Sequence, residues 1–302
     1  MDSVSIITVN FNQPNATIEL LLSLNRSYKD DLEIILVDNA SDINHEVEFK
    51  KIIPNLIFIR SEENLGFAGG NNLGINLAKG DFIFLINNDT EIPAGCLEAL
   101  IAEFKAQPKI GLLSPLILYA DDKSIIQYAG YTPLNYLTAR NTQIGQYEKN
   151  TGQYDGLSYE TGFCHGAAVI CRRKDLLKAG LMDTNYFLYY EELDWCEKFK
   201  HIGKTINFTG KTFIYHKESI SVGKESPIKT YFLTRNRMLF IRKNTGFLNT
   251  ILFSIYYTFI ACPKMVIVYI KNGRMDLAKQ VVKALIWNFT HEKNSTHLGF
   301  KN

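Results

Sequence analysis

Short apolar runs alternate with an amphipathic segment in the first third of the chain. Four runs are rich in apolar residues, as buried strands are: Val4–Val9, Leu32–Val37, Leu56–Arg60 and Asp81–Ile86. Between the first two runs, Ala16–Ser27 carries leucine and isoleucine at helical spacing. This repeated order of strand, helix and strand predicts an α/β fold with a Rossmann-like, mostly parallel central sheet flanked by helices.

The pattern of hydrophobic positions changes twice beyond this region. Ile110–Tyr159 is rich in Tyr, Asn, Thr and Gly and has no long helical period, so we expect a strand, a hairpin and surface loops there. Tyr231–Lys243 reads as a basic, aromatic helix and Asp276–Phe289 as an amphipathic helix. We therefore expect an α/β domain over residues 1–245 and a C-terminal helical appendage over residues 246–302.

An apolar run of 24 residues, Phe247–Ile270, lies in this appendage. The run is long enough to span a bilayer, but Pro263 and Lys264 interrupt it. Lys and Arg flank it on both sides and tyrosines lie near its ends, which suits a membrane interface. We rank docking on a membrane surface, or a helical contact in a homodimer, above a true span.

Charge and cysteine content narrow the class of protein. The chain has 302 residues and a net charge of +2, so it lacks the global basic field of a nucleic-acid-binding protein. Its five cysteines include no Cys-x-x-Cys pair. The N-terminus, Met1-Asp2-Ser3, lacks the basic flank and apolar core of a signal peptide. These features predict a cytoplasmic protein with unpaired thiols.

Polar clusters follow three of the predicted strands. They are Thr8-Val9-Asn10, Asp38-Asn39-Ala40-Ser41-Asp42 and Asn87-Asn88-Asp89. Any one cluster is as well explained by turn formation, because Asn, Asp and Ser are common turn residues. Together they predict a ligand site, since the carboxyl ends of parallel strands meet at one edge of the sheet.

A glycine-rich segment, Asn64 to Asn72, precedes a predicted helix. Its glycines allow the backbone to approach a ligand closely, and the helix N-terminus favours an anion. The segment matches neither the G-x-G-x-x-G fingerprint of dehydrogenases nor a P-loop. Asp89, the acid of the last strand-end cluster, suits a Mg²⁺ ion that also takes substrate phosphates, or it caps the following helix.

Acidic residues open a second helix, at Glu191-Glu192-Leu193-Asp194. They either complement the helix dipole or supply a general base held beside aromatic residues. His216 ends a predicted strand. A single histidine in such a place is more often structural than a ligand.

The combined pattern resembles glycosyltransferase family 2, which has a GT-A fold, and within it the rhamnosyltransferase-like branch of bacterial polysaccharide biosynthesis. The resemblance covers about Val4 to Asn244. Each motif is short, but their order and spacing together are specific. The motifs are Ile7-Thr8-Val9-Asn10-Phe11-Asn12, Val37-Asp38-Asn39-Ala40-Ser41-Asp42, Asn64-Leu65-Gly66-Phe67-Ala68-Gly69-Gly70-Asn71-Asn72, Leu85-Ile86-Asn87-Asn88-Asp89-Thr90, Gly166-Ala167-Ala168, Tyr190-Glu191-Glu192-Leu193-Asp194 and His216.

The resemblance implies a donor-binding role for several residues. Thr8, Asn10 and Asp38 would hold the base and ribose of a nucleoside-diphosphate sugar. The glycine-rich loop would complete that pocket. The loop and strand-end residues expected at the donor are Gly66, Gly70, Asn72 and Asn88.

The resemblance also implies the catalytic and metal-binding residues. Asp89 matches the metal-binding acid of the family's Asp-x-Asp motif, and His216 matches a histidine that joins the Mg²⁺ or Mn²⁺ ion. Glu192 matches the general base, with Glu191 as the alternative. The sequence departs from the family pattern where Asn87 replaces the first acid of Asp-x-Asp and where the base is Glu rather than Asp.

A membrane-associated, metal-dependent inverting glycosyltransferase is the expected function. It would move a sugar from a nucleoside-diphosphate sugar to a saccharide or lipid-linked acceptor at the inner face of the cell membrane. The rhamnosyltransferase-like branch implies rhamnose as the sugar. The alternative is a catalytically inactive nucleotide-sugar-binding module. Such a module should lack the metal acid or the base, and the sequence retains both Asp89 and Glu192.

Overall fold

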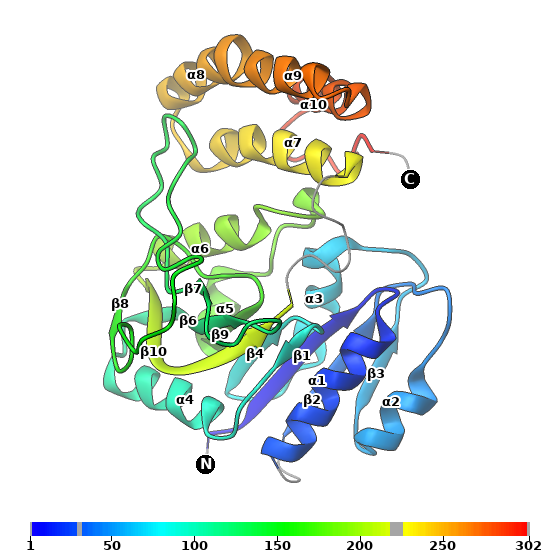
Figure 1. Cartoon of the computed structure of the whole chain (residues 1–302), viewed down its shortest axis with the longest axis vertical. Coiled ribbons are helices and arrows are strands. Elements are labelled where there is room, and N and C mark those ends of the chain that lie inside the picture. The colour runs from blue at the N-terminus through cyan, green and yellow to red at the C-terminus, as the bar shows by residue number, and fades with distance from the viewer. Residues whose placement is uncertain (1, 29–31, 218–225, 301–302) are drawn as a thin grey trace.

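A single sheet forms the centre of the computed structural model, which describes residues 2–28, 32–217 and 226–300 (Figure 1). Within these residues ten strands form the sheet, and the main path runs β3-β2-β1-β4-β9-β6-β10-β5. β7 pairs with β6, and β8 pairs with β10. The strands are β1 (Val4–Asn10), β2 (Glu33–Asp38), β3 (Ile57–Arg60), β4 (Phe82–Ile86), β5 (Thr90–Glu91), β6 (Ile110–Tyr119), β7 (Ile126–Tyr128), β8 (Ser158–Glu160), β9 (Ala168–Arg172) and β10 (Thr205–His216).

The sheet core is parallel, as the sequence predicts. β1 pairs in parallel with both β2 and β4, and β2 pairs in parallel with β3. β9 enters antiparallel between β4 and β6, while β10 runs parallel to β6. Six strands therefore end at one edge, where Asn10 lies opposite Asp38.

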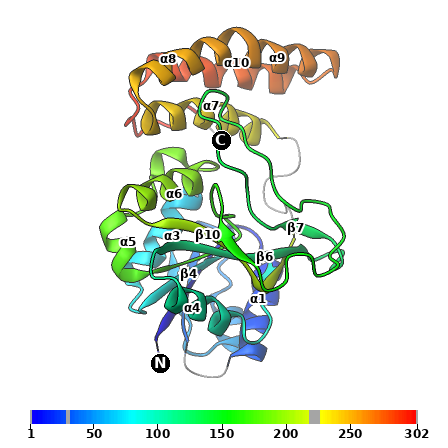
Figure 2. The ribbon, with the colours of Figure 1, turned by 90° about the vertical axis from the view of Figure 1, so that its left-hand side faces the viewer.

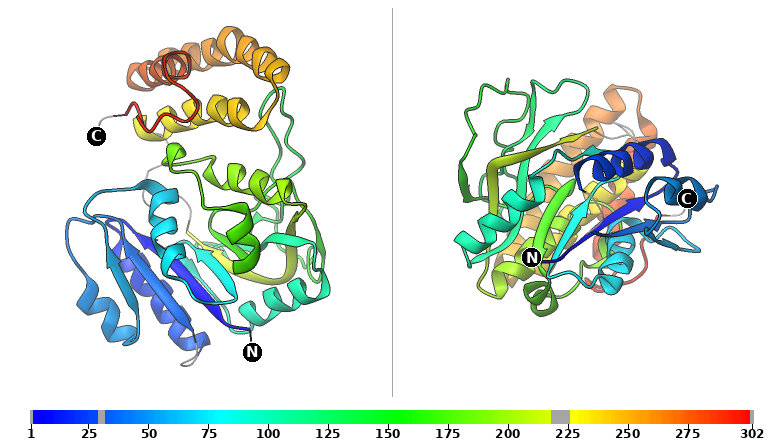
Figure 3. Two further views of the ribbon diagram at one scale, coloured as in Figure 1. Left: turned by 180° about the vertical axis from the view of Figure 1, so that it is seen from behind. Right: turned by 90° about the horizontal axis from the view of Figure 1, so that it is seen from below.

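Helices cover both faces of the sheet. They are α1 (Pro14–Ser27), α2 (Glu46–Ile52), α3 (Gly66–Leu77), α4 (Cys96–Ala106), α5 (Arg173–Ala179), the 3₁₀ turn η1 (Thr184–Tyr186) and α6 (Glu191–His201). One hydrophobic core joins a sheet face to Leu20 of α1, Phe49 of α2 and Phe104 of α4. The core on the other face includes Ile75 of α3 and Trp195 of α6. Figure 1 shows α1 in front of the sheet, and Figure 3 shows the opposite face.

The C-terminal helices form a separate layer at one end of the molecule (Figures 1 and 2). They are α7 (Pro227–Asn244), α8 (Phe247–Tyr256), the π-helical turn η2 (Tyr257–Ala261), α9 (Cys262–Lys271) and α10 (Met275–Thr290). α10 packs against both α7 and α9. α7 thus belongs to this layer in space, although the predicted boundary at residue 245 assigns it to the first domain. The predicted division itself stays a prediction.

A hairpin over residues 131–143 reaches from the sheet to the helical layer (Figure 2). Its strands meet at isolated bridges between Tyr131 and Gln143 and between Asn135 and Arg140. At its far end Tyr136 stacks on Phe240 of α7 with ring centroids 6.4 Å apart. The hairpin and α7 together therefore form a wall beside α6.

Candidate active site

Asp89 and His216 meet where β4 and β10 end. The two-residue strand β5 follows Asp89 directly and pairs antiparallel with the end of β10, so that Thr90 lies opposite His216. The backbone N–H of Lys217 donates to the carbonyl oxygen of Asp89 at 3.0 Å. This pairing holds His216 Nε2 3.1 Å from Asp89 Oδ1. Two residues that are 127 positions apart therefore share one site.

Gln127 fixes the orientation of the His216 ring. His216 Nδ1 lies 2.7 Å from Oε1 of the buried Gln127. When Nδ1 donates this hydrogen bond, Nε2 presents its lone pair toward Asp89 and lies 3.4 Å from Asn87 Nδ2. Asp89 Oδ1 is buried and has no hydrogen-bond partner within the described residues. A carboxylate oxygen and an imidazole lone pair facing each other fit a divalent cation between or beside them.

The donor set at this point is small. Within residues 2–28, 32–217 and 226–300 no group of three or more His, Cys, Asp or Glu side chains is placed to hold a metal ion. One carboxylate and one imidazole make an incomplete shell, which Mg²⁺ usually fills with substrate phosphates and water. The arrangement therefore fits a metal that arrives with a phosphorylated ligand.

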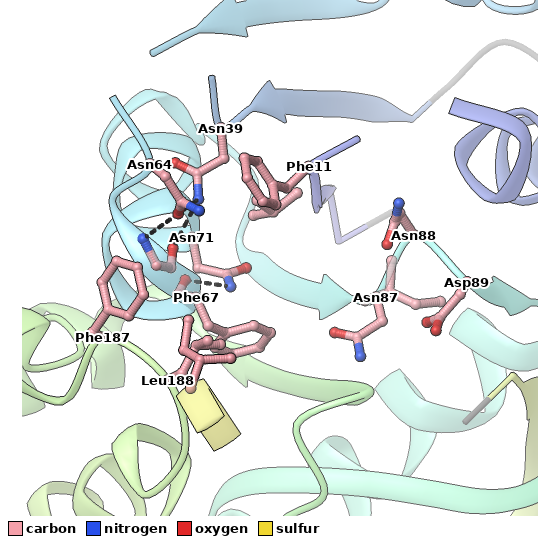
Figure 4. Close-up of a pocket in the computed structure, with 14 residues that line it drawn as sticks. Phe11, Asn39, Asn64, Phe67, Asn71, Asn87, Asn88, Asp89, Phe187 and Leu188 are labelled. Atoms are coloured by element: carbon pink, nitrogen blue, oxygen red, sulfur yellow. Dashed lines mark hydrogen bonds between the residues drawn. The ribbon is translucent and has the colours of Figure 1, made fainter. Parts of the chain in front are cut away.

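A cavity of about 250 Å³ opens beside Asp89 (Figure 4). In Figure 4 the side chains of Asn87, Asn88 and Asp89 lie on one side of it, and those of Asn39, Asn64 and Phe67 lie on the other. Its lining residues are Val9, Phe11, Asn39, Asn64, Gly66, Phe67, Asn71, Ile86, Asn87, Asn88, Asp89, Phe187, Leu188 and Ile228. The lining combines amide groups with aromatic rings, which suits a nucleotide.

Gly66 closes one wall of this cavity. It adopts a φ of +70°, and a Cβ built at this position would lie 2.2 Å from the carbonyl oxygen of Phe187. That same oxygen accepts a hydrogen bond from the N–H of Phe67 at 2.8 Å. Only glycine therefore allows α3 to begin against the segment around Phe187. This close approach joins two parts of the chain, and the predicted approach of the glycine-rich backbone to a ligand stays a prediction.

Amide side chains hold the loop between β3 and α3. Asn39 Nδ2 donates to Asn64 Oδ1 at 3.0 Å and to the carbonyl of Gly66 at 3.1 Å, while its Oδ1 accepts from the N–H of Leu65 at 3.0 Å. Asn71 Nδ2 donates back to Phe67 O at 2.9 Å. These bonds fix the loop. Asn64 Nδ2 and Asn71 Oδ1 make no hydrogen bond to the described part of the chain, and both residues line the cavity.

Two predicted donor residues of β1 lie on the side of the strand away from the cavity. Asn10 is fully buried, where its Nδ2 donates to Ser41 Oγ at 3.0 Å and its Oδ1 accepts from Thr17 Oγ1 at 2.9 Å. Thr8 is also fully buried, and its hydroxyl has no partner within the described residues. Because strand side chains alternate, their neighbours Val9 and Phe11 line the cavity instead.

Two other predicted donor residues, Asp38 and Asn72, form hydrogen bonds with other parts of the chain. Asp38 is fully buried and accepts from the N–H of Ser41 at 2.9 Å, with Arg60 3.4 Å away. Asn72 exchanges two hydrogen bonds with the backbone of Met182. Neither residue lines the cavity.

Two further predicted residues also have packing roles. A Cβ built at Gly70 would lie 2.9 Å from Val9 Cγ1, so this glycine lets α3 approach β1 closely. Asn88 lines the cavity, yet its Nδ2 donates to Thr17 Oγ1 at 2.9 Å.

Glu192 lines a second cavity, of about 470 Å³, and Glu191 does not. Burial raises the pKa of Glu192 to about 7, against opposing backbone N–H groups of Glu192 and Tyr190. Glu191 is buried with Oε2 unpartnered within the described residues, and burial together with the charge of Glu192 raises its pKa well above the ordinary value. A carboxyl whose pKa lies near neutral pH and whose side chain lines a cavity suits a general base.

A row of aromatic rings connects the second cavity with the Asp89–His216 pair. Tyr131 lines that cavity and stacks on Phe163, with centroids 3.9 Å apart. The ring of Tyr131 is parallel to that of His165 at 6.5 Å, and His165 meets His216 edge-on at 5.8 Å. Burial, with a smaller effect from His216, lowers the pKa of His165 to about 3, so this ring is neutral.

Arg235 and Arg237 of α7, two basic residues of the predicted basic helix, have different surroundings. Arg235 is fully buried, where its guanidinium donates to the carbonyls of Leu298 and Tyr186 and faces the rings of Phe232 and Trp287. It is a structural residue. Arg237 lines the second cavity.

Sequence reasoning missed several residues that the fold brings to the site. Phe11, Asn39 and Asn71 lie within the motifs quoted above, and their place in these motifs was the available signal. Gln127 and His165 had no local signal, because their positions depend on strand pairing far along the chain.

Known proteins resemble this chain over most of its length. The hexosyltransferase Agl10 of low-salt glycan biosynthesis in Haloferax volcanii is 24% identical over 244 residues, covering 79% of this chain and 75% of that protein. An N-acetylglucosaminyl-diphospho-decaprenol L-rhamnosyltransferase of Mycobacterium tuberculosis is 21% identical over 244 residues, covering 74% of this chain and 79% of that protein. Both relatives are sugar transferases by name.

Solved structures share the fold. The mannosyltransferase PcManGT of Pyrobaculum calidifontis, in complex with GDP-Man and Mn²⁺, has a TM-score of 0.59 and 14% identity, covering 96% of this chain and 87% of that one. Residues 1–349 of S. aureus TarS give a TM-score of 0.58 and 15% identity, covering 95% and 81%. These likenesses confirm the expected GT-A fold. The model of the family described as glycosyl transferase family 2 matches residues 5–179, which is more than half of the chain. This chain belongs to glycosyl transferase family 2.

Proposed function

We propose that this glycosyltransferase is metal-dependent and inverts the anomeric configuration of the sugar that it transfers. The observation that carries the proposal is the pairing of Asp89 with His216, 3.1 Å apart, beside a cavity of about 250 Å³ that Asp89 lines. Glu192, with a pKa raised by burial to about 7, adds a base in the neighbouring cavity. A fold-related mannosyltransferase carries Mn²⁺ and GDP-Man in its solved structure, which supports a divalent ion and a nucleotide-sugar donor here.

The donor nucleotide would occupy the cavity beside Asp89. Phe11 is 37% exposed and lines this cavity, so its ring is available to stack on a base. The free amide nitrogen of Asn64 and the free amide oxygen of Asn71 supply one donor and one acceptor for the edge of the base. The diphosphate would then reach toward Asn87 and Asp89. We propose these groups in place of direct base contacts from Thr8 and Asn10.

Glu192 would take the proton of the acceptor hydroxyl. That oxygen forms a bond to the anomeric carbon, while the bond from this carbon to the donor phosphate oxygen breaks and its electron pair leaves with the nucleoside diphosphate. A divalent ion held by Asp89 and His216 supplies positive charge near the departing phosphates. Gln127 keeps the His216 ring in one orientation. A single displacement of this kind inverts the configuration, and rhamnose is our proposal for the sugar.

Two variants test this mechanism. Glu192→Gln removes the base and should lower transfer by about 10²–10⁴-fold with donor affinity retained. Asp89→Ala should lower both metal-dependent donor binding and transfer. Glu62→Gln changes an exposed acid away from both cavities and serves as the control. Near-normal transfer in both variants would refute the mechanism, and donor binding without turnover in the wild-type protein would favour an inactive binding module.

The acceptor side would face a membrane. α8, η2 and α9 follow one another as a continuous helical segment of 25 residues, Phe247–Lys271. An apolar stretch of 18 residues within it has a mean hydropathy of 1.8, and 22% of that stretch is buried. Length and composition would also permit this segment to cross a bilayer. Its exposed face includes Phe247 at 83% and Phe259 at 74% exposure. Residues 247–290 contain five Lys or Arg and one Asp, so the apolar face lies among positive charges. We propose that this face docks on an anionic membrane surface and gives access to a lipid-linked acceptor.

Vesicle sedimentation tests the docking. The protein should bind vesicles of phosphatidylglycerol and phosphatidylcholine better than phosphatidylcholine alone, and high salt should weaken the binding. Leu248→Asp with Phe259→Asp should abolish it, while Leu177→Asp, an exposed leucine on α5, should not. Equal binding by all variants would refute the docking. If the protein forms a homodimer that Leu248→Asp with Phe259→Asp dissociates, the apolar face would instead be a contact with a second copy of the chain.

A further inference from the structure

Two arginines and one glutamate line the second cavity, which is more positive charge than the binding of a neutral sugar requires. It lies between the hairpin over 131–143, the start of α6 and α7, and Glu192 is one of its lining residues. Arg140 reaches it from the hairpin and Arg237 from α7. Three tyrosines also line the cavity, and a sugar ring can pack against their aromatic faces: Tyr131, Tyr189 and Tyr190.

Neither arginine has a carboxylate partner within the described residues. Arg237 is partly buried, and the one side-chain hydrogen bond that it makes there runs from Nε to Tyr190 Oη at 2.9 Å. Arg140 is exposed and makes no side-chain hydrogen bond or ion pair with the described residues. Asn141, which also lines the cavity, has a buried Nδ2 without an acceptor among the described residues. Donors are therefore in excess of acceptors in this lining. Arg140 is exposed, whereas Arg237 is partly buried, and a partly buried cation is costly unless a ligand pairs with it.

The arginines do not serve to tune the base. No ion pair joins Glu192 to Arg140 or Arg237, and burial raises the pKa of Glu192 to about 7, whereas a nearby guanidinium would lower it. Their charge is left for a ligand. Guanidinium groups are the side chains that best match the paired oxygens of a phosphate.

We propose that this cavity binds an acceptor sugar that carries a phosphoryl or diphosphate group. Arg140 and Arg237 hold the anion, the tyrosines hold the sugar ring, and the acceptor hydroxyl lies at Glu192. The inference rests on the proposed function, because it assigns the acceptor of that same reaction. It also predicts that the protein discriminates between acceptors. A neutral glycoside of the same sugar leaves both guanidinium groups unpaired and binds more weakly than the phosphorylated sugar.

Calorimetric titration with two matched probes tests the assignment. The probes are octyl N-acetylglucosaminyl diphosphate and octyl N-acetylglucosaminide, both below their micelle concentrations and with EDTA present. We expect the charged probe to bind at least about tenfold tighter than the neutral one, as about 1.4 kcal/mol of charge-assisted bonding gives. The preference should vanish in Arg140→Gln with Arg237→Gln and shrink less in Arg237→Lys, which keeps the charge. It should persist in Arg26→Gln, a surface arginine on α1.

Two results would overturn the assignment. Equal affinities in the wild-type protein, or a preference that survives the double substitution, would show that the arginines bind no anion. A preference that appears only when Mn²⁺ replaces EDTA, and that disappears in Asp89→Ala, would place the diphosphate in the donor site. Arg140→Gln alone, on the exposed hairpin, keeps the test valid if Arg237 variants fail to fold. Release of nucleoside diphosphate from nucleotide-sugars with Mn²⁺, measured on the same wild-type preparation without EDTA, separates this inference from the proposed function, because it depends on the donor site and not on these arginines.

Discussion

The pH dependence of transfer follows from the environment of Glu192. Burial raises the pKa of this carboxyl to about 7, from an ordinary value of 4.5. A protonated carboxyl cannot accept the acceptor's proton, so transfer should fall as the pH drops below 7. The rate should fall about tenfold for each pH unit and reach about 1% of its plateau near pH 5. Glu191 does not line the second cavity, so no second carboxylate faces the acceptor there.

The assay is the initial rate of sugar transfer at saturating donor and metal, from about pH 5 to about pH 9. Donor affinity measured over the same range separates loss of the base from weaker metal or phosphate binding. Glu192→Asp should keep a pH-dependent rate, and Glu192→Gln should give a low rate without this break. A profile that is flat down to pH 5.5, or one that breaks near the ordinary Glu value, would contradict the role of buried Glu192 as base.

Three other substitutions test separate parts of the site. Gln127→Leu frees the His216 ring and should weaken Mn²⁺ binding by about 10–100-fold, measured by electron paramagnetic resonance with UDP present; unchanged affinity would refute the orienting role. Gly66→Ala should lower the free energy of unfolding in urea by at least about 1 kcal/mol, because its Cβ meets a carbonyl oxygen at 2.2 Å, whereas Gly246→Ala meets no atom within 4 Å and should change little. Phe11→Ala should weaken nucleotide binding by about tenfold or more, as loss of base stacking does, and an unaltered Kd would place the base elsewhere.

The sequence predicts the parallel half of the sheet well. The runs that become β1, β2, β3 and β4 are each short, apolar and separated by turn or helix signals, so local pattern and final pairing agree. The strand-end clusters then meet at one edge because parallel strands leave no other arrangement. The same logic explains why the region of the Asp89 site could be predicted.

The residues that contact a ligand are harder to predict than the edge where they lie. Alternation along β1 separates Thr8 and Asn10 from Val9 and Phe11, but it does not say which pair faces the cavity. That choice depends on α3 packing against Val9 on one side and on Thr17 of α1 bonding to Asn10 on the other.

Long-range pairing decides the rest of the site. β5 has two residues and β7 has three, too few for any periodic signal, yet they bring His216 and Gln127 to Asp89. The role of α7 was equally invisible, because its packing on α10 involves helices that follow it in the sequence.

Turnover of a panel of nucleoside-diphosphate sugars, with and without divalent metal, tests the central claim most directly. The purified protein should release nucleoside diphosphate from at least one donor with Mg²⁺ or Mn²⁺, lose this activity in EDTA and regain it when metal is restored. Asp89→Ala should be inactive under the same conditions while remaining folded by circular dichroism. Equal turnover with and without metal, or full activity in Asp89→Ala, would contradict a metal site at Asp89 and His216.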